Sequence, residues 1–334
     1  VITGCAINSP LGDSVDANMH ALYSKKSNFT KIDSYNISDS SVKYAGKCEY
    51  INTSILKDKK IKKILTRKDL LGVCTACEAA KDANIEVSTP YRMGIYVGVS
   101  CSQMGDFSDY FMLMSECADL TNQTFDSKKF GQEIHEKINP IVVLKVLMNN
   151  TLAYSSIELN IKGHNYNFME FEVAGAKAVY EAFKAIQEEK IDIAIAGATC
   201  SPLEPFQMIN AYLWDLLIQD QSRMCIPKPY DAFRQGTLLS EAAAFVVLEN
   251  EEHAIKRRAN ILGKIVGFGY GAGNIYFFLD KNDIVNSNTV DINDPFGIQI
   301  SFKALLNYAQ IDLSDIGFIL SSAYGSVVFD KYEA

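Results

Sequence analysis

The sequence predicts a layered α/β fold, and three features of the 334-residue chain support this prediction. Short apolar runs rich in β-branched residues alternate with longer segments whose apolar residues recur at spacings of three and four. Hydrophobic residues make up 48% of the chain and charged residues 22%, which is the composition of a globular protein with a large core. Alternation of this kind is typical of a sheet covered by helices.

Six apolar runs have the length and composition of strands. We expect strands at Val1–Ile7, Gly94–Val99, Ile191–Ala198, Ala243–Glu249, Ile261–Gly269 and Ile316–Leu320. Five longer segments have helical spacing. We expect helices near Ile61–Ala83, Asp106–Ala118, Val173–Glu189, Pro205–Ile218 and Ile298–Ala309. The charged stretch NEEHAIKRRAN then predicts a boundary, which gives an N-terminal half over residues 1–250 and a partial second half over residues 251–334.

Charge and hydropathy exclude several classes of partner. The net charge of −8 and the pI near 5.2 repel phosphate backbones, so we expect no nucleic-acid partner. The opening VITGCAINSPLG shows neither the basic region nor the long apolar region of a secretory signal. The most apolar run, Ile141 to Met148, is short and is interrupted by Lys145. We therefore expect a cytoplasmic protein without a membrane partner.

The cysteines predict neither a disulfide framework nor a metal site. They stand at positions 5, 48, 74, 77, 101, 117, 200 and 225, mostly inside apolar runs. Cys74 and Cys77 form a CxxC within the helical pattern LLGVCTACEAAKDA, but no second ligand pair accompanies them. We expect reduced, buried thiols, no metal and no cofactor.

Two further motifs favour ordinary structural interpretations. Glycines at 267, 269, 271 and 273 form a GxGxGxG run, but no helical pattern follows, so a dinucleotide site is not predicted. The run KDKKIKKILTRK at 57–68 fits an amphipathic helix with a solvated lysine face. Contact of this run with an acidic carrier protein is the alternative.

Four segments, considered together and in their order along the chain, carry a resemblance to a known family. They are VITGCAINSPLG, IELNIKGHNYNF, KIDIAIAGATCSPLEPFQMINAY and KPYDAFRQGTLLSEAAAFVVLENEEHAIKRRANILGKIVGFG. Together they resemble the first strand, the approach to the nucleophile, the next core strand and the DxxRxG block of the β-ketoacyl-carrier-protein synthase family. The resemblance covers nearly the whole chain. It implies the thiolase-like layered fold (αβαβα), with two similar halves of which the second is incomplete in this chain.

In that family a cysteine thiolate carries the growing acyl chain. Counting from Gly163 through Asn165 and Tyr166, the position of this cysteine is Glu172, at the start of the predicted helix 173–189. A carboxylate is a weak nucleophile toward a thioester, and its product would be a mixed anhydride of higher energy. The plainer interpretation is that Glu172 is an anion favoured by a helix N-terminus, without an acyl-carrying role.

Two histidines of the family stabilise the enolate formed from a malonyl unit. The only histidines of this sequence are His20, His135, His164 and His253. Aligning Asp330 and Glu333 with the family's Asp-x-x-Glu pair puts Ser322 where the first catalytic histidine stands. The position of the second would lie beyond Ala334. The sequence therefore offers no Cys-His-His triad.

Loss of the triad on a retained scaffold resembles the chain-length factors (ketosynthase β subunits) of type II polyketide synthases. These pair with an active ketosynthase α subunit and meet the acyl carrier protein through that heterodimer. Many carry glutamine where this chain has Glu172, and a carboxylate there would repel a malonyl carboxylate. Two alternatives remain: a malonyl-carrier-protein decarboxylase that uses Glu172, and a degenerate ketosynthase that only stabilises its partner.

The segment VGVSCSQMGDF resembles the strand and loop before the helix that a chain-length factor contributes to the product tunnel. The resemblance implies that Phe107, Tyr110 and Met114 face the tunnel, and spacings of three and seven put them on one helical stripe. An ordinary core stripe is the alternative. The family's last strands have no counterpart here, and a truncated chain, a segment outside this sequence and cover by a partner all remain open.

Overall fold

The computed structural model describes the chain except for residues 39, 101–107, 215, 220–225, 273–295 and 327–328. The chain folds into two compact units. Unit 1 consists of Val1–Asn28, Lys47–Phe206 and Ser240–Gly263, and unit 2 consists of Phe29–Gly46, Gln207–Leu239 and Lys264–Ala334. Each unit thus joins segments that are far apart in the sequence.

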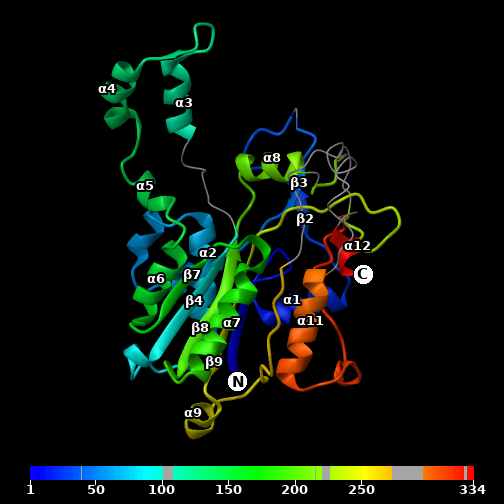
Figure 1. Cartoon of the computed structure of the whole chain (residues 1–334). Coiled ribbons are helices and arrows are strands. Elements are labelled where there is room, and N and C mark those ends of the chain that lie inside the picture. The colour runs from blue at the N-terminus through cyan, green and yellow to red at the C-terminus, as the bar shows by residue number, and fades with distance from the viewer. Residues whose placement is uncertain (39, 101–107, 215, 220–225, 273–295, 327–328) are drawn as a thin grey trace. The chain divides into compact units, whose positions relative to one another are not determined.

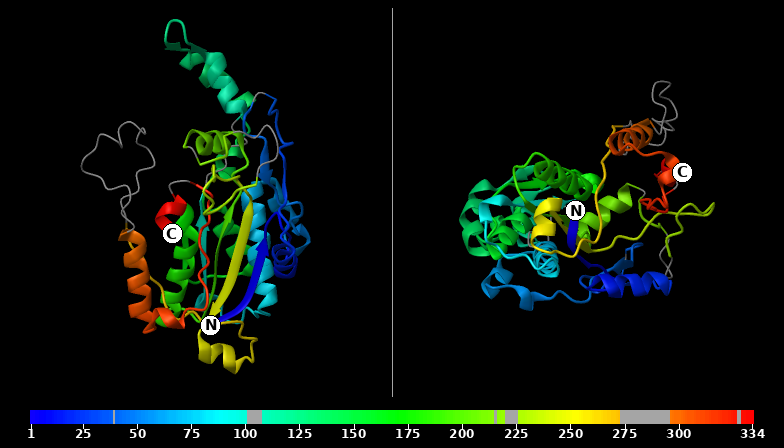
Figure 2. Two further views of the ribbon diagram at one scale, coloured as in Figure 1. Left: turned by 90° about the vertical axis from the view of Figure 1, so that its right-hand side faces the viewer. Right: turned by 90° about the horizontal axis from the view of Figure 1, so that it is seen from below.

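A five-stranded mixed sheet forms the centre of unit 1 (Figure 1). Its strands in spatial order are β1 (Ile2–Asn8), β9 (Ala242–Glu249), β8 (Ile193–Cys200), β4 (Met93–Val99) and β7 (Asn165–Phe168). β4 runs parallel to β8 and β7, whereas β9 is antiparallel to β8 and β1. Figure 2 shows β1 and β9 side by side at one edge. Four of the six predicted strands are thereby confirmed, and β7 was not predicted.

Helices cover both faces of this sheet, because side chains alternate along each strand. Every residue of β4 is buried. The odd-numbered residues Met93, Ile95, Val97 and Val99 join a core cluster with buried residues of α2 (Arg67–Asp82). Gly98 instead meets α7 (Ala174–Gln187), and the small residues Ala196 and Ala198 of β8 lie near the same helix. The odd-numbered side chains of β4 therefore pack under α2, and Gly98, Ala196 and Ala198 leave room for the start of α7 on the other face.

The remaining helices of unit 1 include two that pack as a hairpin, α3 and α4. The bounds are α1 (Val15–Tyr23), α3 (Ser108–Cys117), α4 (Ser127–Lys137), α5 (Val142–Lys145), α6 (Asn150–Leu159) and α9 (Glu251–Lys256). The short strands β5 (Ala118–Asp119) and β6 (Thr124–Phe125) lie between α3 and α4. Over the described residues, no helix combines the length and apolar character needed to cross a membrane.

The helix predicted at 61–83 is two elements. Residues Lys59–Lys63 form a short 3-10 turn, and α2 begins only at Arg67. Thr66 ends the first segment because its side-chain hydroxyl accepts the backbone N–H of Asp69 and so caps α2. The prediction was too long at this end because apolar spacing continues through the turn.

Unit 2 contains shorter elements. They are the hairpin of β2 (Phe29–Lys31) and β3 (Tyr44–Gly46), most of α8 (Pro205–Leu213), α11 (Phe296–Ala309) and α12 (Phe329–Glu333). The strands predicted at 261–269 and 316–320 are wrong. Gly263 forms a single bridge with Ile2, and the side chains of Phe318 and Leu320 are 85% and 91% exposed. An apolar run becomes a strand only where it pairs continuously with a neighbouring strand. Among the described residues, the first run pairs with β1 only at this bridge, and no strand pairs with the second.

Candidate functional site

The start of α7 lies at the carboxyl edge of the parallel strands. β7 ends at Phe168, a 3-10 turn follows at Phe171–Val173, and α7 begins at Ala174. Because β4, β8 and β7 are parallel, their carboxyl ends meet at one edge of the sheet. Glu172 stands in the turn at this edge, which is where open α/β sheets place ligands. The predicted place of Glu172 at a helix start is thus the observed one.

Gly98 holds the first turn of α7 against the sheet. A Cβ added at Gly98 would lie 2.5 Å from the carbonyl carbon of Ala174 and 2.6 Å from its oxygen, so only glycine admits this approach. Ala174, Ala178 and Ala182 are buried along one face of the helix at spacings of four. Their small side chains keep α7 close to the sheet along its length.

The Glu172 side chain is exposed and, among the residues that the structure describes, has no hydrogen-bond or ion-pair partner. No side chain caps α7, so the N–H groups of its first turn face no side-chain acceptor. The nearby carboxylate of Glu170 already pairs with Lys177. The environment of Glu172 is therefore the field of the helix N-terminus, which favours an anion.

A buried network ties together other elements at the carboxyl edge. The carboxylate of Glu241, just before β9, is fully buried and accepts two hydrogen bonds from Arg67 of α2, at 2.6 and 2.7 Å. The Ser201 hydroxyl, just after β8, donates to the same carboxylate at 2.6 Å, and the backbone N–H of Cys48 donates at 2.8 Å. These bonds fix the segments that frame the start of α7.

Sequence reasoning missed this network. Arg67 and Glu241 are 174 positions apart, and nothing local links them. One signal was present: an acidic residue inside the apolar run LLSEAAAFVVLE has to be paired if the run is buried.

The turn that carries Ser322 lies in unit 2 and is held by two carboxylates. Glu333 accepts the backbone N–H groups of Ser322 at 2.6 Å and Ala323 at 3.2 Å. Asp330 accepts the N–H of Gly325 at 3.0 Å, and Gly325 has a φ of 75°, in the region that favours glycine. The Asp-x-x-Glu pair used to align Ser322 thus does organise the backbone around it.

Tyr230 joins both carboxylates of this turn. Its hydroxyl donates to Glu333 at 2.7 Å, and its backbone N–H donates to Asp330 at 2.7 Å. Burial alone would raise the pKa of Glu333, but the hydrogen bonds from Ser322, Tyr230 and Ala323 outweigh it and lower the pKa. Glu333 is therefore held as a carboxylate. The alignment of Ser322 with a catalytic histidine of the family stays a prediction; its hydroxyl would be a weaker donor to a developing oxyanion than an imidazole.

The predicted tunnel stripe is described only in part. Phe107 lies outside the described residues. Tyr110 packs edge-to-face on Phe130 of α4, with ring centroids 5.8 Å apart, and Met114 is 37% exposed. The side chains that α3 buries are Leu113 and Cys117. Tyr110 therefore has a packing role inside the α3–α4 hairpin, and its role toward a tunnel stays a prediction.

Three of the described cysteines, Cys48, Cys74 and Cys77, lack the character of a nucleophile. Burial raises the pKa of Cys48, Cys74 and Cys77 to about 12, so these thiols stay protonated at neutral pH. Cys74 and Cys77 lie inside α2. Within the described ranges, no three side chains of the metal-ligating types come together as a metal site.

A helix start at the carboxyl edge and a turn organised by an Asp-x-x-Glu pair are the framework of a ketosynthase-like protein. Comparison with known families agrees with this. The family model described as "Beta-ketoacyl synthase, N-terminal domain" matches residues 1–254. The chain belongs to the β-ketoacyl synthase family.

Relatives by sequence include the 3-oxoacyl-(acyl-carrier-protein) synthase 2 of Staphylococcus aureus. It is 26% identical over 335 residues, which cover 100% of this chain and 76% of the relative. A 3-oxoacyl-(acyl-carrier-protein) synthase homolog of Saccharomyces cerevisiae is 27% identical over 199 residues, which are 60% of this chain and 42% of the relative. The matched region is thus less than half of the yeast protein.

Solved structures with a similar fold include the ishigamide ketosynthase/chain length factor, with a TM-score of 0.78 at 19% identity. A type II polyketide synthase acyl-carrier protein in complex with its ketosynthase bound to the hexaketide gives 0.76 at 18% identity. Each alignment covers 100% of this chain and 75% of the solved chain. The thiolase-like ketosynthase fold predicted from the sequence is confirmed.

Proposed function

We propose that this chain is a non-acylating chain-length factor. It forms a heterodimer with an active ketosynthase α subunit of a type II polyketide synthase and helps to set the length of the polyketide. The observation that carries the proposal is Glu172 at the start of α7, on a scaffold that is otherwise that of a ketosynthase. Ser322 in the preserved Asp-x-x-Glu turn supports it, because a catalytic scaffold without its reactive groups suits a subunit that contributes shape.

The exposed edge of the sheet supports a partner. β7 is the last strand on its side, so its outer backbone groups have no strand beside them among the described residues. Tyr166 of this strand is 53% exposed although its ring stacks on Tyr96 of β4 at 5.7 Å. A strand of a protein partner along this edge would pair with the outer backbone groups of β7.

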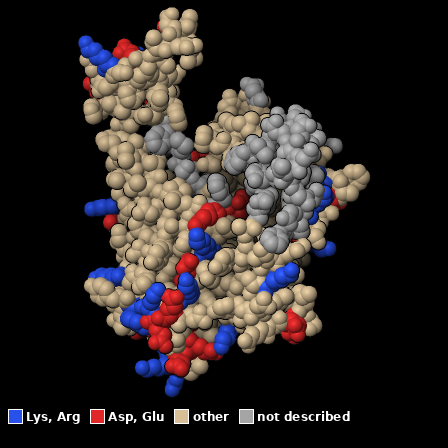
Figure 3. Space-filling model, viewed as in Figure 1, with Lys and Arg blue, Asp and Glu red and all other residues tan. Residues whose placement is uncertain are grey.

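Apolar side chains near α5 support the same conclusion. Val143 and Leu144 of α5 are largely exposed, as are Leu147 and the α6 residue Ile157. Figure 3 shows few charged side chains over this side of unit 1. Large exposed apolar areas mark protein interaction sites. In the proposed complex the ketosynthase covers such surface, and the acyl carrier protein delivers its substrates to the heterodimer.

Co-purification tests the proposed heterodimer. An affinity tag on this chain is expected to recover a co-expressed ketosynthase of its own polyketide synthase in a one-to-one complex. The matched control is the same pair with Tyr166→Asp and Val143→Asp in this chain, which places charges on the proposed interface and should abolish recovery. Recovery of this chain alone, or equal recovery by the charged variant, would contradict the proposal.

Product analysis separates the proposed function from its alternatives. A purely structural partner leaves product length unchanged by any folded variant of this chain. A decarboxylase that uses Glu172 releases carbon dioxide from malonyl carrier protein and loses this activity in Glu172→Ala. For a chain-length factor we expect that some folded variants of this chain change the product length, and that the chain releases no carbon dioxide from malonyl carrier protein.

A further inference from the structure

A hollow on the α2 side of the sheet in unit 1 has the size of a small-molecule pocket. It encloses about 480 Å³, within the range of roughly 300–1,000 Å³ typical of such sites. The start of α7 with Glu172 lies on the other face of the sheet, so this hollow is separate from the site described above. The lining residues that matter for binding are Lys57, Cys77, Ile85, Val87, Glu158 and Leu159.

The inner lining is apolar because the hollow lies where two core clusters border each other. Met93 and Ile195 belong to the cluster under α2, and Cys77 belongs to a second cluster beside it. Leu159 packs against both clusters, and Ile85 packs against the first, yet both remain only partly buried. Leu159 and Ile85, with the partly buried Val87, present apolar surface to the hollow, and a hydrocarbon chain there would release the water that covers this surface.

The polar end of the hollow is preorganised. Lys57 Nζ donates to the backbone carbonyl of Glu158 at 2.6 Å. The Glu158 carboxylate, only 4% exposed, accepts the backbone N–H groups of Lys57 at 2.8 Å and Asp58 at 3.3 Å. The Lys57 ammonium keeps further N–H groups that a ligand oxygen can accept.

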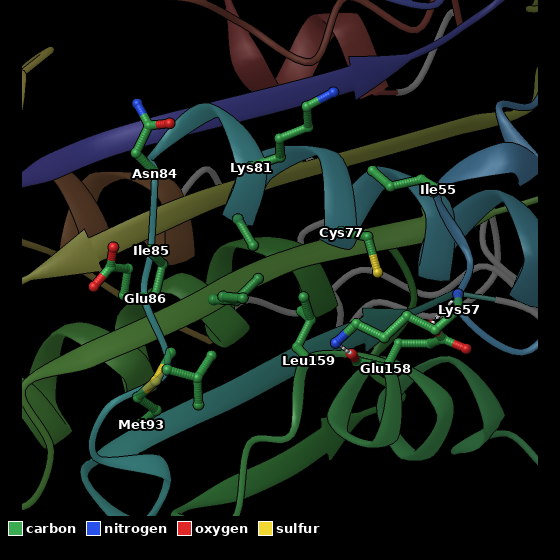
Figure 4. Close-up of a pocket in the computed structure, with 13 residues that line it drawn as sticks. Ile55, Lys57, Cys77, Lys81, Asn84, Ile85, Glu86, Met93, Glu158 and Leu159 are labelled. Atoms are coloured by element: carbon green, nitrogen blue, oxygen red, sulfur yellow. Dashed lines mark hydrogen bonds between the residues drawn. The ribbon is translucent and has the colours of Figure 1, made fainter.

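Figure 4 shows which side chains face the hollow. Cys77 and Leu159 point into it, with Lys57 beside Leu159, whereas Lys81 and Asn84 point away. The charges that remain at its polar end are thus the Lys57 ammonium and the Glu158 carboxylate, together with the partial negative charge at the end of α6. A charged head would be attracted by one of these two groups and repelled by the other, so the two contributions oppose each other. A charged head would also lose its hydration in the hollow, and an uncharged head avoids this cost.

The Cys77 thiol contributes packing and no covalent chemistry. It is buried, and burial raises its pKa to about 12, so it stays protonated and a weak nucleophile at neutral pH. A ligand in the hollow is therefore held by non-covalent contacts.

From this geometry we propose that the hollow binds an uncharged, medium-chain amphiphile. The hydrocarbon chain lies over Leu159, Ile85 and Val87. A hydroxyl or carbonyl oxygen of the head accepts a hydrogen bond from Lys57 Nζ. The site is independent of the proposed chain-length role, because none of its residues belongs to α7 or to the Ser322 turn.

The test is isothermal titration calorimetry of the purified protein, in its native assembly, with three probes that share a ten-carbon chain. 1-Decanol is expected to bind saturably at one site per chain. Decanoate and decyltrimethylammonium are expected to bind at least about tenfold more weakly, since each must give up the hydration of its charged head while the charges of Lys57 and Glu158 act on it in opposite directions. Non-saturable uptake of 1-decanol, or tighter binding of either charged probe, would overturn the proposal.

Two variants localise the site. Ile85→Trp fills the hollow and should weaken 1-decanol binding at least about tenfold, whereas the matched Ile255→Trp, on an exposed position of α9 outside the lining, should not. Lys57→Met keeps an aliphatic side chain and the backbone N–H that donates to Glu158, but it removes the ammonium. It should weaken 1-decanol binding by about 2- to 10-fold. Lys57 is exposed, so this variant tests the site even if Ile85→Trp fails to fold. Unchanged 1-decanol binding by a folded Ile85→Trp variant or by the Lys57→Met variant would refute the proposed binding site.

Discussion

At position 172 a helix start that suits a thiolate holds a carboxylate. Both are anions, and the unpaired N–H groups of α7 favour either one. Their chemistry differs in the next step, because a thiolate exchanges acyl groups with a thioester at nearly equal energy, whereas a carboxylate would have to form a mixed anhydride. If Glu172 stands at the position of the family's cysteine, as we propose, the chain keeps an anion at the helix start and cannot carry an acyl group there.

We therefore expect no acyl group on this chain. When the heterodimer is incubated with an acyl carrier protein bearing a labelled acyl group, intact-mass spectrometry should find the unmodified mass for this subunit. The thiols of Cys48, Cys74 and Cys77 do not compete, because burial keeps their pKa near 12. The ketosynthase partner in the same mixture is the positive control. A stable label on this subunit would exclude the non-acylating role.

Restoring the nucleophile alone should not restore condensation. Glu172→Cys places a thiol at the start of α7, but Ser322 still cannot act as an imidazole donor toward the enolate. Loss of one such electrostatic donor costs about 10²–10³ in rate in other sites. The measurement is chain elongation by the variant heterodimer with the partner's own cysteine changed to alanine. Elongation well above that of the same heterodimer with Glu172 would show that Ser322 suffices.

How far single residues could be predicted depended on whether their neighbours lie close in the sequence. Glu172 and Ser322 were found because short motifs surround them, and the structure places them at a helix start and in a carboxylate-bound turn. The pairing of Arg67 with Glu241 could not be found, since burial of Glu241 results from the meeting of α2, β8 and β9. Local sequence does not specify that meeting.

At the scale of elements, a buried carboxylate joins β1, β9 and α9. Glu249, the last residue of β9, accepts hydrogen bonds from Arg257 and from Thr3 of β1, and His253 Nδ1 lies 2.9 Å away. Asn250 caps α9 in the next position. Burial alone would raise the pKa of Glu249, but the hydrogen bonds of Arg257, Thr3 and His253 outweigh it and lower the pKa.

This cluster predicts a pH-dependent loss of stability. The folded pKa of Glu249 lies below the ordinary value of about 4.3, so its stabilisation is present above that value and disappears as the pH falls through the folded pKa. Glu249→Gln should lower the free energy of unfolding at pH 7 by about 3–5 kcal/mol. Urea titrations from pH 7 down to pH 3 should show the gap between wild type and variant shrinking.

The exposed Glu252 in the same helix provides the control for this measurement. Glu252→Gln should change stability by less than about 0.5 kcal/mol at any pH. A gap between wild type and Glu249→Gln that stays constant from pH 7 to pH 3 would mean that the charge of Glu249 does not contribute.

Element prediction succeeded where an element is buried within unit 1. β4 and β8 are apolar on both faces because helices cover both, and such runs stand out in the sequence. β7 was missed since its polar sequence NYNF belongs to an exposed edge. The run at 316–320 was predicted as a strand because its residues are apolar, but strand formation also needs a neighbour that the sequence pattern cannot supply.

For the whole molecule, the family and fold were predictable because four motifs recur in order along nearly the whole chain. The boundary near residue 250, the cytoplasmic location and the absence of a nucleic-acid partner stay predictions. The charged stretch at that boundary forms α9, which is tied to β9 through Glu249. The division into units could not be predicted, since each unit combines three separate segments of the chain.

Product length tests the whole assembly. If α3 contributes the floor of a tunnel in the heterodimer, Tyr110→Ala should lengthen the product by at least one two-carbon unit, because it removes a ring and its phenol. Met112→Ala, at a strongly exposed position of the same helix, is the matched control and should leave the length unchanged. The measurement is mass spectrometry of products from equal amounts of folded heterodimer.

The contact of Tyr110 with Phe130 supports the alternative, in which Tyr110 only packs and does not set product length. If Tyr110 serves only the α3–α4 hairpin, its truncation leaves a cavity and lowers the melting temperature, with a cost approaching about 3–5 kcal/mol for a well-buried aromatic side chain. Product length would then stay that of the wild type. Because Tyr110 is only partly buried, the hairpin should survive the substitution, so length and stability can be read from the same protein. Wild-type product from a folded Tyr110→Ala heterodimer would remove Tyr110 from the tunnel.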